Sequence, residues 1–156
     1  MTPERLTVVA EPLSAAAFAP FGQVVATGDM VLELRNDEVF HLNVLSYEHR
    51  PLVCDHLNRH HNATQALVAL AGRPTLVVVA PADRALTDRA DLESVRAFVC
   101  DGTAGINLSI ATWHWGPYPL MDRVDLVNLQ GAGFLHDNEV ANLQRDLGVV
   151  VEVVLG

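Results

Sequence analysis

Three groups that can bind a ligand or move a proton stand together in the stretch Arg59-His60-His61-Asn62-Ala63-Thr64-Gln65-Ala66-Leu67-Val68-Ala69-Leu70-Ala71-Gly72. The apolar run that begins at Gln65 is followed by a Gly-Arg-Pro turn and by a second apolar run over 75–80, which indicates a β-hairpin. Because successive side chains on a strand point to opposite faces, only one of His60 and His61 is expected to face inward. The alternative for this pair is a solvated turn.

Short apolar runs separated by Pro and Gly continue on both sides of this hairpin. They predict strands over 6–10, 21–25, 39–45, 52–57, 95–100, 106–113, 124–129 and 149–155. A short helix capped by Ser14 and a second helix over 139–147, ended by Gly148, are expected, with a polar loop over 27–38. The pattern predicts an all-β fold with one or two short helices: a single-domain, jelly-roll-like antiparallel β-barrel over residues 1–156.

Charge and composition exclude several functions. The net charge is −9 and all ten basic residues are Arg, so no lysine can form a Schiff base. An acidic chain without a basic cluster is not expected to bind nucleic acid. A carboxylate ligand would need a local Arg, and Arg59 and Arg73 are candidates for that contact.

The expected location is the cytoplasm. No apolar stretch approaches the roughly 20 residues of a membrane span, and the first residues do not have the form of a signal peptide. Cys54 and Cys100 lie in apolar contexts and are expected to be buried free thiols, which suits a reducing compartment.

Trp113-His114-Trp115 is a second candidate site. A histidine flanked by aromatic side chains at a strand end is suited to acid/base catalysis, since burial and neighbours can shift its pKa. Equally, His114 could be a rim residue bonded to a backbone carbonyl, with the tryptophans filling the core. A divalent metal is the other option, with His60, His61 and Gln65 as candidate ligands; the expectation is no cofactor or a weakly bound metal.

The spacing of this region resembles the first motif of the cupin superfamily. Gln65 follows His61 by four residues, and Gly72 follows Gln65 by seven. Arg59 and Gln65 stand where that motif usually has a first His and a Glu. In the second motif Leu108 stands where a His is usual.

Several short stretches resemble the ureidoglycolate lyase family within that superfamily. They are Glu11-Pro12-Leu13, Phe21-Gly22, Pro51-Leu52, Leu57-Asn58-Arg59-His60, Thr64-Gln65-Ala66, Val77-Val78-Val79-Ala80, Asp91-Leu92, Arg96-Ala97-Phe98, Gly105-Ile106-Asn107, Thr112-Trp113-His114 and Val124-Asp125-Leu126. The resemblance implies a homodimeric barrel that splits ureidoglycolate into glyoxylate and urea during purine (allantoin) degradation. It implies that His60, Gln65, Asn107 and His114 line the site, with His114 or His60 as the proton-transfer group. We predict catalytic roles for His60, His114 and Gln65, and a small polar or carboxylate substrate contacted by Arg59, Arg73, Asn107, Ser109 and Trp113.

The sequence also departs from that family. Leu108-Ser109 stands where Tyr-His is usual, Gln130-Gly131-Ala132 stands where Arg-Gly-Gly is usual, and 27–38 is too short for the family's Arg-containing flap. A second version of the functional hypothesis is therefore a diverged lyase or isomerase that acts on a more apolar ligand than ureidoglycolate. The alternatives are a non-catalytic cupin that binds a small molecule or serves as a partner subunit, and a metal-dependent oxygenase or isomerase.

Overall fold

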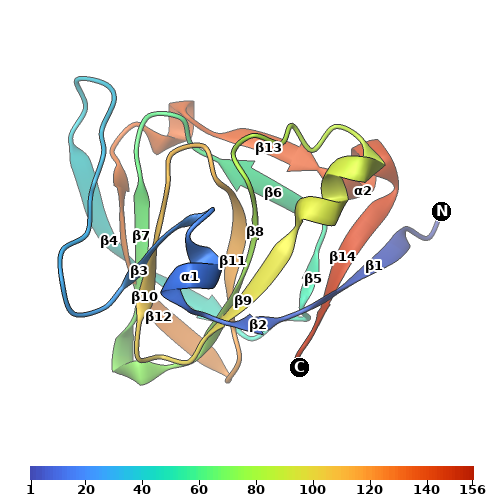
Figure 1. Cartoon of the computed structure of the whole chain (residues 1–156), viewed down its shortest axis with the longest axis horizontal. Coiled ribbons are helices and arrows are strands. Elements are labelled where there is room, and N and C mark those ends of the chain that lie inside the picture. The colour runs from blue at the N-terminus through green and yellow to red at the C-terminus, as the bar shows by residue number, and fades with distance from the viewer.

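A computed structural model describes residues 1–156 as three β-sheets with short helical turns (Figure 1). The strands are β1 (Glu4–Val9), β2 (Glu11–Pro12), β3 (Gly22–Val25), β4 (Phe40–Glu48), β5 (Val53–Cys54), β6 (His56–Arg59), β7 (Gln65–Ala69), β8 (Thr75–Ala80), β9 (Arg96–Cys100), β10 (Gly105–Leu108), β11 (Trp113–Pro119), β12 (Arg123–Gly131), β13 (Glu139–Asn142) and β14 (Val149–Val154). The helices are α1 (Ala15–Phe18), α2 (Leu143–Leu147) and the 3₁₀ turns η1 (Leu70–Gly72), η2 (Arg89–Ser94) and η3 (Phe134–His136). The all-β prediction is confirmed.

The two larger sheets enclose the barrel. One has the strand order β3-β10-β7-β12-β4 and the other β13-β6-β11-β8-β9-β2. Between them lies an apolar cluster that includes Leu67 and Ile106 from the first sheet and Val77, Val79 and Phe98 from the second. The predicted hairpin is wrong: the η1 turn joins β7 and β8, but β7 pairs with β10 and β12 in one sheet and β8 pairs with β11 and β9 in the other.

A third sheet, of order β1-β14-β5, covers the outside of the six-stranded sheet. Leu76, Val78 and Ala80 of β8 pack with Val151 and Val153 of β14 in a second apolar cluster. Strand β8 is consequently buried at every position, with its two faces in different cores. The pairs β1–β14 and β2–β9 are parallel, so the predicted antiparallel arrangement does not extend to these edges.

Two expected elements are wrong in detail. The helix predicted over 139–147 is a strand, β13, followed by the short helix α2, because residues 139–142 pair with β6 and Asn142 caps α2 at Arg145 N. The single strand predicted over 106–113 is divided: β10 ends at Leu108, a turn follows, and Trp113 begins β11, which continues to Pro119 with a register shift between Trp115 and Tyr118. Ser14 and Gly148 do cap α1 and α2 as expected.

Cys54 and Cys100 are buried and free, as predicted, and burial raises the pKa of these thiols to about 12 and about 11. None of the helices has the length and apolar character needed to cross a bilayer.

Candidate functional site

Part of the barrel interior is polar and hollow. The buried polar residues Gln65, His114, Asn128 and Gln130 border a cavity of about 310 Å³, which we call the barrel cavity. Its walls are formed by Leu45, Tyr47, Asn58, His60, Gln65, Leu67, His114, Trp115, Gly116, Asn128, Gln130, Phe134, Leu135 and Asn138. The lining contains neither acidic side chains nor Lys or Arg, so its chemistry rests on imidazole, amide and phenol groups.

Strand alternation places the two histidines in this cavity. Asn58 of β6 pairs with His114 of β11, so these two side chains share the inner face. His60 follows Asn58 by two residues and lines the same cavity. The ring centroids of His60 and His114 are 5.3 Å apart, which makes them neighbours in the wall.

Backbone carbonyls fix the form of both imidazoles. His60 Nδ1 lies 2.6 Å from Asp137 O, and His114 Nδ1 lies 3.1 Å from Thr112 O. A carbonyl oxygen only accepts, so each Nδ1 carries the proton and each Nε2 keeps a free lone pair. Burial lowers the pKa of His114 to about 4; the electrostatic influence of the neighbouring His60 adds to that shift and the Thr112 carbonyl opposes it. His114 is therefore a neutral base at neutral pH.

Carboxamides form a second feature of the cavity. Gln65 Nε2 donates to Asn128 Oδ1 at 2.9 Å, and Asn128 Nδ2 donates to Asn43 Oδ1 at 2.9 Å. Gln65 Oε1 is buried and has no partner. The wall thus presents an unsatisfied acceptor beside two imidazoles.

None of the five predicted substrate-binding residues lines the barrel cavity, and Arg59, Trp113 and Arg73 are each engaged in other contacts. Arg59 alternates with Asn58 and His60; it pairs with Glu139 at 2.7 Å and stacks over the Trp113 ring at 4.2 Å. Trp113 is buried in the apolar core beneath the third sheet, and its Nε1 donates to Arg84 O. Arg73 lies at the β7–β8 turn and pairs with Asp122 at 2.7 Å.

Asn107 is likewise turned outward. Its neighbours Ile106 and Leu108 pair with Leu67 and Gln65, whose side chains face the interior, so Asn107 faces the opposite way. Its Nδ2 donates to Gln23 Oε1 and Val31 O. Ser109 is exposed in the turn after β10 and borders only a narrow crevice beside His60, Gln65 and His114.

The predicted metal ligands are divided between two faces. His60 and Gln65 line the cavity, whereas His61 has a half-exposed side chain and its Nε2 lies 2.7 Å from Glu139 Oε2. His60 is thus the inward member of the pair. No group of three or more His, Cys, Asp or Glu side chains is arranged to hold a metal ion. The candidate metal donors that line the cavity are His60, Gln65 and His114.

Sequence reasoning missed several lining residues. Tyr47, Asn58, Asn128 and Gln130 were not singled out, although Asn128 is a polar residue within the apolar run 124–129. A fully buried Asn in such a run is the signal that could have found the amide chain.

Beside Tyr47, the Arg50 guanidinium stacks 5.3 Å from the Tyr47 ring centroid and 4.3 Å from that of Tyr118.

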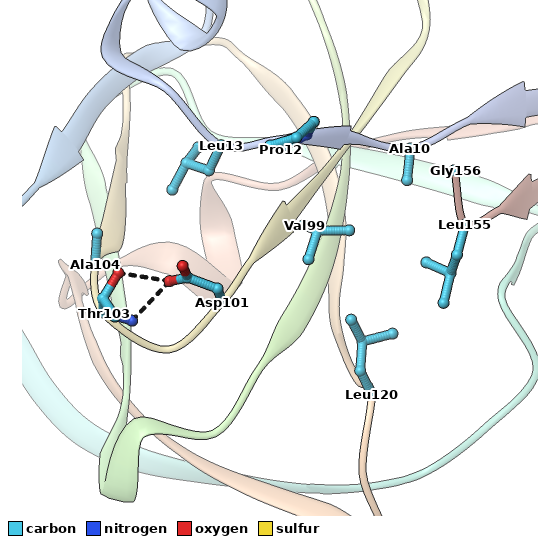
Figure 2. A pocket seen from close by; sticks show the side chains of 10 residues that line it. All are labelled: Ala10, Pro12, Leu13, Val99, Asp101, Thr103, Ala104, Leu120, Leu155 and Gly156. Atoms are coloured by element: carbon cyan, nitrogen blue, oxygen red, sulfur yellow. Dashed lines mark hydrogen bonds between the residues drawn. The ribbon is translucent and has the colours of Figure 1, made fainter.

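A larger hollow lies away from this site. It has a volume of about 460 Å³ and is lined by Ala10, Pro12, Leu13, Val99, Asp101, Thr103, Ala104, Leu120, Leu155 and Gly156, and we call it the outer cavity (Figure 2). Its carboxylate, Asp101, already accepts hydrogen bonds from the N–H and hydroxyl of Thr103. These bonds lower the pKa of Asp101.

Comparison with known proteins identifies relatives of this barrel. Residues 39–151 match the family model described as ureidoglycolate lyase. A ureidoglycolate lyase of Burkholderia mallei is 30% identical over 96% of this chain and 96% of its own length. Ureidoglycolate lyases of Pseudomonas fluorescens and Azotobacter vinelandii are each 33% identical, over 81% and 79% of this chain and 86% and 85% of their own lengths.

Proposed function

The chain belongs to the ureidoglycolate lyase family, and we propose that it cleaves ureidoglycolate into glyoxylate and urea. One observation carries the proposal beyond the family match: two imidazoles with free Nε2 lone pairs and an unsatisfied amide oxygen converge in one cavity. The substrate is a carbinolamine with a hydroxyl, an N–H and a terminal –NH₂, and these are donors that such acceptors can bind.

The reaction needs one proton to move from oxygen to nitrogen. His114 Nε2 takes the proton of the carbinol hydroxyl, the C–N bond breaks as the C=O bond of glyoxylate forms, and the departing urea nitrogen receives the proton. Neither water nor an oxidant is consumed. Because burial makes His114 a weak base, its imidazolium is a strong acid for protonating that nitrogen. His60 supplies the second acceptor, which orients the hydroxyl and N–H groups.

The substrate carboxylate requires a cation, and Arg50 is the candidate. Its guanidinium stacks on Tyr47, a cavity residue, and forms no ion pair, whereas Arg59 and Arg73 are already paired with carboxylates. In a chain of net charge −9, an unpaired guanidinium beside the site is the group best suited to hold an anion.

A weakly bound divalent metal would use a different ligand set from the one expected. His60 Nε2, His114 Nε2 and the orphaned Gln65 Oε1 fit such an ion, and His61 does not. When bound, it would act as a Lewis acid that polarises a substrate oxygen. Such an ion would occupy the lone pair of His114 Nε2, so metal binding is an alternative to the proton transfer described above and does not take part in it.

We propose that a second copy of the chain covers the outer face of β4, β12 and β7. Leu42 and Val44 on β4 are 63% and 55% exposed, so this strand turns apolar side chains outward. They pair with Leu129 and Val127 of β12 and form a continuous apolar surface. Val44→Glu should convert a dimer to a monomer in size-exclusion chromatography with light scattering; an unchanged mass would contradict this interface.

The cytoplasm remains the proposed location, since it keeps Cys54 and Cys100 reduced.

The test is release of glyoxylate and urea from ureidoglycolate by purified protein, in chelator and with added Mg²⁺, Mn²⁺, Ni²⁺ or Zn²⁺. The neighbouring histidines provide a matched pair: His60→Ala should lose most turnover, and His61→Ala should keep it, because only His60 lines the cavity. Absence of turnover under every metal condition would overturn the proposal and leave a binding protein.

A further inference from the structure

The barrel interior contains a chain of three carboxamides that packing does not require. Asn128 is completely buried on β12, where the preceding inward residue is Leu126 in the apolar interior. A buried amide is unfavourable unless it is hydrogen-bonded, and Asn128 is bonded on both sides, to Gln65 and to the half-buried Asn43. This series of hydrogen-bonded amides runs from Asn43 on the outer strand β4, through Asn128 on β12, to Gln65 in the wall of the barrel cavity.

This series of hydrogen bonds determines which atom of Gln65 is left without a partner. The amide nitrogen of Gln65 donates to Asn128 Oδ1, and Asn128 in turn donates to Asn43 Oδ1. The remaining atom, Gln65 Oε1, is buried without a partner in a residue only 8% exposed. Leaving a buried acceptor unpaired is destabilising, so its retention in the cavity wall points to a ligand that donates to it.

The chemistry of that ligand follows from the neighbouring groups. His60 and His114 each hold their proton on Nδ1 against a carbonyl and offer Nε2 as a further acceptor. A wall with three acceptors suits a ligand with several N–H and O–H donors. A ureido group carries two kinds of N–H, whereas a carboxylate carries none and would be repelled by Gln65 Oε1.

We propose that Gln65, held in orientation by Asn128 and Asn43, binds the terminal –NH₂ of the ureido group. This inference rests on the proposed function and adds an orientation to it. The ureido end of the substrate lies at Gln65, and the carboxylate end lies toward Tyr47 and Arg50, which line and flank another part of the same cavity. Gln65 contacts the substrate, whereas Asn128 and Asn43 are positioning residues that act through it.

The two products separate the ends of the substrate and give a direct test. Urea and glyoxylate are each titrated against ¹⁵N-labelled protein by chemical-shift perturbation and are used separately as inhibitors of turnover. In Gln65→Met, we expect urea affinity to fall about tenfold while glyoxylate affinity changes less than threefold, with KM rising in parallel with the urea effect. Asn43→Ala, whose side chain is outside the cavity lining, should weaken urea by a smaller factor.

Conservative and control variants separate binding from folding. Gln65→Glu keeps an oxygen acceptor, because one carboxylate oxygen can accept a hydrogen bond from Asn128 once the Asn128 amide is rotated. The affinity of Gln65→Glu for urea should therefore be higher than that of Gln65→Met. Gln23→Met removes an amide on the opposite side of the same sheet, bonded to Val31 N, and should leave both product affinities unchanged. Thermal unfolding of each variant shows whether it is folded.

Two results would overturn the inference: urea affinity unchanged in Gln65→Met, or glyoxylate affinity lost as strongly as urea affinity. The second result would mean that Gln65 presents its –NH₂ to a carboxylate. The binding titrations need no turnover. Gln65-dependent urea binding without cleavage would therefore support this inference while overturning the proposed function.

Discussion

The two cavities of this protein differ in size and in chemistry, and we assign the proposed activity to the smaller one. The outer cavity, of about 460 Å³, contains apolar side chains and one carboxylate that Thr103 already satisfies. The barrel cavity, of about 310 Å³, contains two imidazoles and an amide oxygen without a partner. Unsatisfied polar atoms held in place by neighbouring groups, rather than volume, distinguish a site built for a ligand from a gap between strands.

The sharpest test of this difference is removal of one group from each cavity. His114→Ala should lower kcat by roughly 10³-fold, because it removes the base that moves the proton. Asp101→Asn keeps the acceptor for Thr103 and should leave kcat within twofold. Steady-state release of glyoxylate measures both. Comparable losses in the two variants would remove the functional distinction between the cavities.

The sequence was sufficient for the barrel but only in part for the site. The strands β7 and β8 and the turn between them followed from the apolar runs and the Gly-Arg-Pro signal, but their placement in two different sheets did not, because strand pairing depends on contacts distant in sequence. His60, His114 and Gln65 were found because rare polar groups stand beside apolar runs. Their roles remain predictions, while their convergence in one cavity is a property of the structure.

What the sequence could not give is the direction of side chains in paired strands. Arg59 and Trp113 each neighbour a cavity residue in the chain, and Asn107 lies between two residues of the apolar interior, yet all three face away because alternation reverses at every position. The strand β13 was missed for a related reason. The helical spacing of Val140 and Leu143 is outweighed by backbone pairing with β6, a contact more than 75 residues away in sequence.

The buried imidazole should also make stability depend on pH. The pKa of His114 is about 4 in the folded protein and about 6.5 when exposed, so the unfolded chain binds more protons between these values. Stability therefore rises with pH across this window and is lost as pH falls from about 6.5 to about 4, by roughly 3 kcal/mol. Guanidinium unfolding of wild type and His114→Phe measures this, and the variant should show a flatter profile. An equal pH dependence in both would mean that His114 titrates normally.

Arg50 provides a smaller effect at the edge of the barrel cavity. Arg50→Met keeps an apolar stem against Tyr47 and Tyr118 but removes the charge, so KM and the inhibition constant of glyoxylate should rise about tenfold. Arg123→Met removes an exposed guanidinium paired with Asp125 and is the control. If the two variants affected KM equally, the long-range field of the protein, rather than a local contact, would attract the anion.

Filling the two cavities completes the comparison with the smallest expected effect. Leu45→Phe adds volume to the wall of the barrel cavity and should reduce kcat/KM several-fold, since the substrate must share a space of about 310 Å³. Val99→Phe adds the same ring to the lining of the outer cavity (Figure 2), where apolar neighbours such as Leu120 and Leu155 can surround it. Extra methylenes are tolerated where a void can accept them, so kcat/KM should stay within twofold and the melting temperature should be unchanged or higher. A loss of activity in Val99→Phe would show that the outer cavity is coupled to the reaction. Unchanged activity would establish that this protein carries its largest hollow without using it in catalysis.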